Sequence, residues 1–122
     1  MTSEQGTWRV DDYTTASGDR PVRDFTQTLT DRDRVEAVAL IRLLEEWGNT
    51  LRRPQSAALG EGLFELRGSQ VRIFYLFRPG RRIALLDGML KKQRRVPADA
   101  LRRARRYQKE IRARDASKAR GQ

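Results

Sequence analysis

The residues of this chain best suited to chemistry are cations in one short run. Residues 90–97 read LKKQRRVP, which places four basic side chains within five positions: Lys91, Lys92, Arg94 and Arg95. Ammonium and guanidinium groups at such density attract polyanions, and guanidinium groups also offer paired hydrogen-bond donors to a phosphate. The run can therefore be a solvated charge cluster, a grip for a polyanion or the edge of a reaction site.

The charge around this run is one-sided. Residues 91–122 hold 13 basic and 3 acidic residues, whereas residues 1–90 hold 13 of each, so the whole net charge of +10 lies in the last quarter of the chain. Such asymmetry suits nucleic acid first, an acidic protein second and an anionic membrane third.

The residue types that are missing limit the chemistry further. The chain has no Cys and no His, which excludes disulfides, a thiol nucleophile and the commonest metal ligand and general base. We therefore expect neither a metal nor a cofactor. The start of the chain lacks an apolar signal core, and no segment approaches the roughly 20 apolar residues that span a bilayer. We expect a cytoplasmic protein with no membrane partner.

The elements that must position the cations begin with a predicted meander. The stretch GLFELRGSQVRIFYLFRPGRRIALLDG is rich in β-branched, aromatic and leucine residues, and two tight-turn signals interrupt it, at residues 68–69 and 79–80. This pattern predicts three antiparallel strands over about residues 63–67, 70–78 and 81–87.

The middle strand of the meander has two different faces. The apolar face is expected to comprise Val71, Ile73, Tyr75 and Phe77, and to continue onto Phe64, Leu66, Ala84 and Leu86. The other face carries Arg72, which lies opposite Glu65 and Asp87 if both turns are two-residue loops. Arg72 is therefore either the centre of a cross-strand ion-pair cluster or part of a reaction site.

The remaining pattern predicts an α+β fold. A short strand over residues 7–13, a helix over 21–29 and a second helix that Thr30 caps precede the meander, and a helix from Pro97 to about residue 113 follows it. The expected order is an N-terminal strand, two helices, a three-stranded antiparallel meander and a C-terminal basic helix. We expect one domain over residues 1–115 and a disordered basic tail over 116–122.

The last predicted helix is unusually basic. It carries six Arg and one Lys through Arg114, with few acids among them. A helix face that is merely solvated normally mixes both signs of charge. Phosphate binding is therefore favoured, and an exposed, solvated helix is the alternative.

The second half of the chain resembles the RelE/HigB superfamily of bacterial toxins, especially its phage-derived HigB-like branch. The pieces that carry the resemblance occur in the family's order: GLFELR at 62–67, RIFY at 72–75, a hydrophobic strand at 83–86, KK at 91–92, a proline at 97 and a helix. The predicted strand and helix pair before them fit the RelE-like order as well.

The resemblance implies the toxin of a type II toxin-antitoxin system, a ribosome-dependent mRNA endonuclease that inhibits translation. Its partners would be the ribosome, mRNA and a cognate antitoxin of the helix-turn-helix, HigA-like kind. Position by position, Arg72 matches the family's strand arginine near the scissile phosphate, and Lys91 and Lys92 match its basic pair, so these three are the expected catalytic residues. RNA binding is expected from Arg94, Arg95, Arg102, Arg103 and Arg106. Arg67 matches the arginine of the family's ELR strand, whose role is either structural or RNA-binding.

RNA cleavage without a metal needs a proton acceptor, cations that hold the phosphorane charge and a proton donor for the leaving oxygen. Arg72 and Arg67 suit the second task, and Lys92 can exchange a proton if its cationic neighbours disfavour its charged form. Tyr75 is an alternative donor. Positioning by the ribosome would reduce the demand on any one side chain. A ParE-like toxin that acts on DNA gyrase and a non-catalytic basic nucleic-acid-binding protein remain alternative functions.

Overall fold

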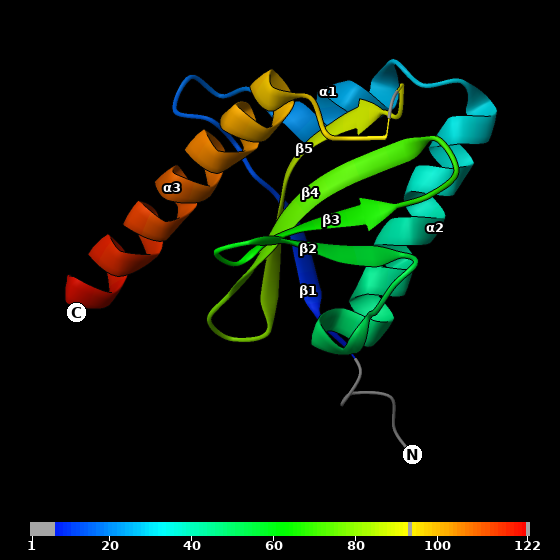
Figure 1. The fold of residues 1–122 in the computed structure, drawn as a ribbon. Helices are drawn as coiled ribbons and strands as arrows, with labels where there is room; N and C mark the ends of the chain where they lie inside the picture. Colours follow the sequence, from blue (N-terminus) through cyan, green and yellow to red (C-terminus); the bar gives the residue numbers. More distant parts are fainter. Residues whose placement is uncertain (1–6, 93, 122) are drawn as a thin grey trace.

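A mixed sheet forms the centre of the structure, a computed structural model that describes residues 7–92 and 94–121. Its five strands lie in the order β1-β5-β4-β3-β2 (Figure 1). They are β1 (Arg9–Asp12), β2 (Ser56–Gly60), β3 (Leu63–Arg67), β4 (Val71–Arg78) and β5 (Arg82–Leu90). β1 pairs in parallel with β5, and the other neighbours pair antiparallel. The predicted α+β class and its meander are thus confirmed, and β2 is a strand that the sequence pattern did not reveal.

Helices cover both faces of this sheet. They are α1 (Pro21–Gln27), α2 (Asp31–Trp47), which continues into a short 3-10 turn, η2 (Gly48–Thr50), and α3 (Ala98–Arg120). As predicted, the Thr30 side chain caps α2 by accepting a hydrogen bond of 3.2 Å from the backbone N–H of Asp33. α2 ends at Gly48, which has a φ of +49° and lies where a Cβ atom would overlap the Trp8 indole.

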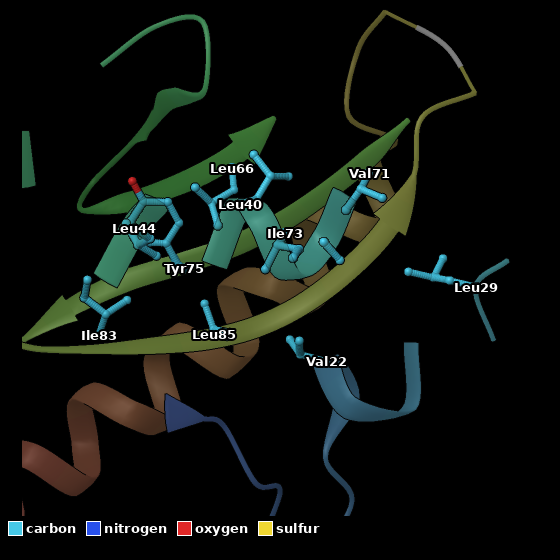
Figure 2. Close-up of a cluster of buried hydrophobic side chains, with 11 residues drawn as sticks. Val22, Leu29, Leu40, Leu44, Leu66, Val71, Ile73, Tyr75, Ile83 and Leu85 are labelled. Atoms are coloured by element: carbon cyan, nitrogen blue, oxygen red, sulfur yellow. The ribbon is translucent and has the colours of Figure 1, made fainter. Parts of the chain in front are cut away.

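The first face of the sheet packs against α1 and α2 (Figure 2). The side chains that share this core are Val22, Leu29, Ala37, Leu40, Leu44, Leu66, Val71, Ile73, Tyr75, Ile83 and Leu85. Each fully buried aliphatic side chain contributes about 1.5–3 kcal/mol relative to exposure. This layer therefore fixes α2 against the strands that carry the candidate site.

The second face of the sheet packs against α3, which runs on the opposite side from α2 (Figure 1). Ala104 and Ile111 of α3 are buried together with Tyr13, Leu63, Phe74, Leu76, Ala84 and Leu86. This face also holds the polar residues of β3, β4 and β5, so the basic helix lies over the charged part of the sheet.

The turn between β4 and β5 is one residue longer than predicted. It spans residues 79–81 and pairs Arg78 with Arg82, whereas a two-residue loop over residues 79–80 would pair Arg78 with Arg81. The offset turns Ala84 and Leu86 to the α3 side. Their predicted place on the apolar face shared with Val71 was therefore wrong.

Arg72 also has different cross-strand neighbours from those predicted. The β3–β4 turn pairs it with Arg67, and the observed register pairs both Glu65 and Asp87 with Phe74. The pairing of β4 with β5 is irregular between Phe74 and Tyr75, and this shift places Asp87 on the same face of the sheet as Arg72. The prediction that Arg72 lies directly opposite Glu65 and Asp87 was therefore wrong. The three side chains nevertheless share one face of the sheet.

α3 is longer than the sequence pattern indicated. It continues to Arg120, so residues 116–120, which were expected to be a disordered tail, are helical. An ion pair of 2.6 Å between Asp115 of α3 and Arg78 of β4 holds this part of the helix to the sheet. The extra turns therefore have a specific anchor beyond the apolar stripe of the helix.

Candidate functional site

Four basic side chains lie in the loop that joins β5 to α3, and we call them the cationic junction: Lys91, Lys92, Arg94 and Arg95. All four are exposed. Within residues 7–92 and 94–121, none of these side chains takes part in an ion pair or a hydrogen bond. Their donors are therefore available to an anion that arrives from solvent.

The β3–β4 turn anchors the first residue of the junction. The Glu36 carboxylate of α2 accepts hydrogen bonds of 2.7–3.2 Å from the backbone N–H groups of residues 69–71, and another of 2.7 Å from the Ser69 hydroxyl. The Gln70 carbonyl of the same turn accepts a hydrogen bond of 2.6 Å from the backbone N–H of Lys91. Glu36 thus positions the junction through the turn.

The environment of Glu36 favours its charged form. Burial raises the pKa of this carboxyl, but the hydrogen bonds from Ser69, Gln70 and Val71 together outweigh burial, so the pKa lies below its ordinary value. Gly68 permits the close approach, because a Cβ atom there would overlap the Glu36 carboxylate. Sequence reasoning missed this anchor, since α2 and the turn are more than 30 residues apart in the chain.

Glu65 and Arg72 form a buried ion pair beneath the junction. Each residue is 6% exposed, and Arg72 Nε lies 3.6 Å from Glu65 Oε2. Arg72 also donates through Nη1 to the carbonyls of Gly68 and Val71, at 2.6 and 3.0 Å. Arg67 approaches the other Glu65 oxygen at 3.9 Å. The Arg72 guanidinium is thus largely occupied inside the protein, as the ion-pair interpretation of Arg72 predicts.

Burial is the largest cause of the pKa shifts of both Glu65 and Arg72. It raises the pKa of Glu65 more than the nearby Arg72, Arg67 and Arg53 lower it. Burial also lowers the pKa of Arg72, although Glu65 opposes this shift. Glu65 is therefore a carboxylate with increased affinity for a proton, held in place by guanidinium groups.

A small hollow brings the pair and the junction together. Its lining comprises Glu65, Arg72, Met89, Lys91, Arg94, Arg95 and Val96. Its volume of about 10 Å³ is close to the minimum that holds one water molecule. The structure therefore gathers four of the predicted site residues around Glu65, whereas Lys92 is exposed beside the hollow without lining it. A phosphate group has to approach from the outer side of the junction.

Four of the cations of α3 hold the helix against the rest of the protein. Arg103 pairs with Asp87 at 2.6 Å, and Arg105 donates to the carbonyls of Leu59 and Gly60, each at 2.8 Å. Arg112 and Arg114 donate to the Glu61 and Thr14 carbonyls. Of the residues expected to bind RNA on this helix, Arg103 therefore has a structural partner.

The other two predicted RNA-binding residues of α3 are more available. Arg102 and Arg106 are exposed, and Arg106 lies over the Tyr107 ring with its guanidinium carbon 5.4 Å from the ring centre. Tyr75, the alternative proton donor, lies in the α2 core and shares a hydrogen bond of 2.7 Å with the Ser56 hydroxyl. Tyr75 is therefore far better explained as a core residue.

Two kinds of feature are absent from the part of the chain that the structure describes: a cluster of potential metal ligands and a membrane-spanning helix. No group of three or more His, Cys, Asp or Glu residues that could hold a metal ion occurs within residues 7–92 and 94–121. No helix in the same residues is both long enough and apolar enough to cross a membrane.

Comparison with known proteins identifies a family. The family model described as "Phage derived protein Gp49-like (DUF891)" matches residues 24–109, which is more than half of the chain. This match includes α2, the meander, the junction and the first half of α3. No curated protein matches the chain.

Proposed function

Because the chain belongs to the phage-derived Gp49-like family, which lies within the RelE/HigB-like toxin group, we propose that it is a toxin that cuts messenger RNA on the ribosome. The family implies a cognate antitoxin as a partner. One observation carries the proposed activity. Four exposed cations without internal partners in the described chain lie beside a buried Glu65–Arg72 pair, at the junction of β5 and α3.

The junction suits the charge that develops during RNA cleavage. Attack of a ribose 2′-oxygen forms a new bond to phosphorus and breaks the bond from phosphorus to the 5′-oxygen, and negative charge accumulates on the phosphorane between these events. Lys91, Arg94 and Arg95 line the hollow and keep free donors for that charge. We assign proton donation to the 5′-oxygen to Lys92, the exposed ammonium beside them.

Glu65 is the candidate proton acceptor that the structure adds to the sequence-based set. It lines the hollow under Lys91 and Arg94, and its raised pKa makes it a stronger base than an exposed glutamate. Only 7% of its side chain is exposed, so the RNA has to displace the junction to reach it. Arg72 is in this account a positioning residue, which orients the Glu65 carboxylate and acts on the RNA through it.

The remaining cations explain how the protein can dock on a ribosome without reading a sequence. Arg102 and Arg106 extend the junction along α3, and contacts of Lys and Arg with phosphates are indifferent to base sequence and weaken with salt. The ribosome would then supply the alignment of the messenger for in-line attack.

The proposal is tested by mapping messenger ends after induced expression. We expect new ends within translated reading frames, lost when translation is blocked and lost in a variant with Lys91, Lys92, Arg94 and Arg95 all changed to Gln. Intact messengers with damaged DNA would instead support a gyrase-directed toxin. Intact messengers with undamaged DNA and normal growth would leave only a binding protein.

The role of Glu65 is tested with a matched pair of variants, Glu65→Gln and Asp87→Asn. Both residues pair with Phe74 and lie on the same face, but Asp87 is engaged by Arg103. In single-turnover cleavage by wild-type protein on ribosomes, the rate should fall as the pH drops through the raised pKa of Glu65. Glu65→Gln should remove this dependence, and folded Asp87→Asn should retain it. A pH profile that Glu65→Gln leaves unchanged would exclude Glu65 as the base.

A further inference from the structure

The outer side of α2 carries an apolar stripe that faces solvent. Val35 is 69% exposed and Val38 is 44% exposed, and Ala39 and Leu43 follow at helical spacing. Residues three, four and eight positions apart lie along one side of a helix. The other side of α2 already packs on the sheet through its own leucines. α2 is therefore apolar on two sides, and the described chain covers one of them.

Grooves border this stripe on both sides. One has a volume of about 480 Å³ and is lined by Asp31, Arg34, Val35, Val38, Ala39 and Arg42. The other has a volume of about 630 Å³ and extends from Ala39 and Leu43 to Arg67 and Arg72 at the end of the meander. Because Ala39 lines both, the two grooves form one continuous surface along α2. We call this surface the α2 groove.

The free charges of the α2 groove are positive. Its acids are already engaged, since Asp31 pairs with Arg34 at 3.1 Å and Glu36 accepts four hydrogen bonds from the β3–β4 turn. In the described chain Arg42 has no ion-pair partner, and Arg67 has only a long contact of 3.9 Å with Glu65. The groove therefore favours an occupant with acidic side chains beside an apolar stripe.

We infer that the α2 groove binds an amphipathic, acidic helix of the cognate antitoxin. An apolar stripe at helical spacing with grooves on both sides suits a second helix, whose apolar residues would cover Val35 and Val38 while its carboxylates reach Arg42 and Arg67. Nucleic acid would use the cations but would leave the exposed valines unexplained. The 17 residues of α2 correspond to about 25 Å, enough to dock several turns of a partner helix.

The location of the groove gives this contact a consequence for the site. Its inner end reaches Arg67, Arg72 and the β3–β4 turn, which donates to Glu36 through residues 69–71 and accepts from the backbone of Lys91 through Gln70. A partner in the groove would therefore hold the base of the junction while leaving the four junction cations uncovered. The inference rests on the toxin-antitoxin nature of the family and is independent of the proposed RNA cleavage.

The test measures binding of the antitoxin candidate, the protein encoded by the reading frame next to this gene, by titration calorimetry. Val35→Asp with Val38→Asp should weaken binding about 100-fold or more, because the change places charge at the centre of the contact. The matched control is Ala113→Asp with Ala116→Asp, which makes the same charge change at exposed positions of α3 and should leave the affinity unchanged. Circular dichroism should show both variants folded.

Each other outcome overturns the inference. Equal affinity of the valine variant and wild type would place the antitoxin elsewhere, and equal weakening by both variants would reduce the effect to overall charge. If the wild-type chain self-associates in sedimentation velocity and only the valine variant is monomeric, with antitoxin binding unchanged, the occupant is a second copy. If the wild-type chain does not bind the protein encoded by the neighbouring reading frame, that protein is not its antitoxin and the inference fails. Messenger cleavage by the valine variant, measured separately, keeps the proposed function distinguishable from all of these results.

Discussion

The cations of the junction and four of the cations of α3 differ in the contacts that they make inside the fold. In sequence they form one basic segment, but in the structure Lys91, Lys92, Arg94 and Arg95 have no internal partners within the described residues. By contrast, the α3 cations Arg103, Arg105, Arg112 and Arg114 each contact a carboxylate or a carbonyl of the rest of the protein. Net charge therefore overstates the number of cations whose donors remain free for an anionic partner.

The difference follows from where each group of side chains lies on the fold. α3 crosses the polar ends of β2 and β3, where carbonyls such as those of Leu59 and Glu61 need donors, and arginines satisfy them. The junction lies beyond the edge of this packing. Its neighbours are Arg72 and Glu65, which already satisfy each other. The junction cations thus remain free, since the described chain gives none of them a carbonyl or carboxylate as a partner.

The largest expected effect is on the most deeply committed cation. Arg72→Ala leaves the Glu65 carboxylate buried without its main partner, so the free energy of unfolding should fall by about 3–5 kcal/mol in denaturant titrations. The double change Arg72→Met with Glu65→Gln should recover most of that loss, because it removes both buried charges. An Arg72→Ala variant as stable as wild type would show that Arg72 belongs with the free cations.

A smaller effect is expected where α3 meets β4 through Asp115. Hydrogen bonds of 2.6 and 3.1 Å from Arg78 are the main reason that the pKa of Asp115 lies below its ordinary value. Asp115→Asn should therefore lower the free energy of unfolding by about 1.5–3 kcal/mol at pH 7.

The pH dependence of this difference has a definite sign. A lowered folded-state pKa contributes stability above the unfolded pKa of an aspartate, about 3.9, and that stability is lost as the pH falls through the folded-state value. Wild type and Asp115→Asn should therefore converge in thermal melts as the pH drops below about 4. A difference that stays constant down to pH 2 would contradict the ion-pair account.

The smallest effect on stability, with a clear effect on the site, is expected from Glu36→Gln. The amide keeps the shape of the carboxylate but loses its charge, so the β3–β4 turn and the attached Lys91 should become less well held. We expect a loss of about 1 kcal/mol or less in stability, since Glu36 is partly solvated. Amide hydrogen exchange at residues 69–71 and 91 should increase together. Faster exchange at residues 69–71 without faster exchange at residue 91 would show that the turn does not hold the junction in place.

The elements of the fold could be predicted from the sequence because each has a strong local signal. The meander has aromatic and β-branched strands between Gly-containing turns, and Thr30 marks the start of α2. Register was less predictable: a one-residue difference in the β4–β5 turn reversed the faces of Ala84 and Leu86. Strand β2 reads SAALG, which has no β-branched or aromatic residue to indicate it.

The candidate site was predictable only in part. The position of Lys91, Arg94 and Arg95 between a strand and a helix indicated that they lie together near Arg72, and they line one hollow with it. Which cations stay free could not be read from residue type, because Arg103 and Arg102 are neighbours in sequence but only Arg103 reaches Asp87. The Glu36 anchor depends on packing between distant segments, for which one sequence carries no signal.

The most direct test of the two cation groups compares two variants with the same change in charge. One is Lys91→Gln with Lys92→Gln, and the other is Arg105→Gln with Arg112→Gln. Each is measured for stability in denaturant and for the salt dependence of binding to a single-stranded RNA. The junction pair should keep wild-type stability and reduce the slope of log affinity against log salt by about 1.4. The helix pair should keep the slope and lose about 1–3 kcal/mol of stability. Equal slopes and equal stabilities for the two variants would contradict the division between free and committed cations.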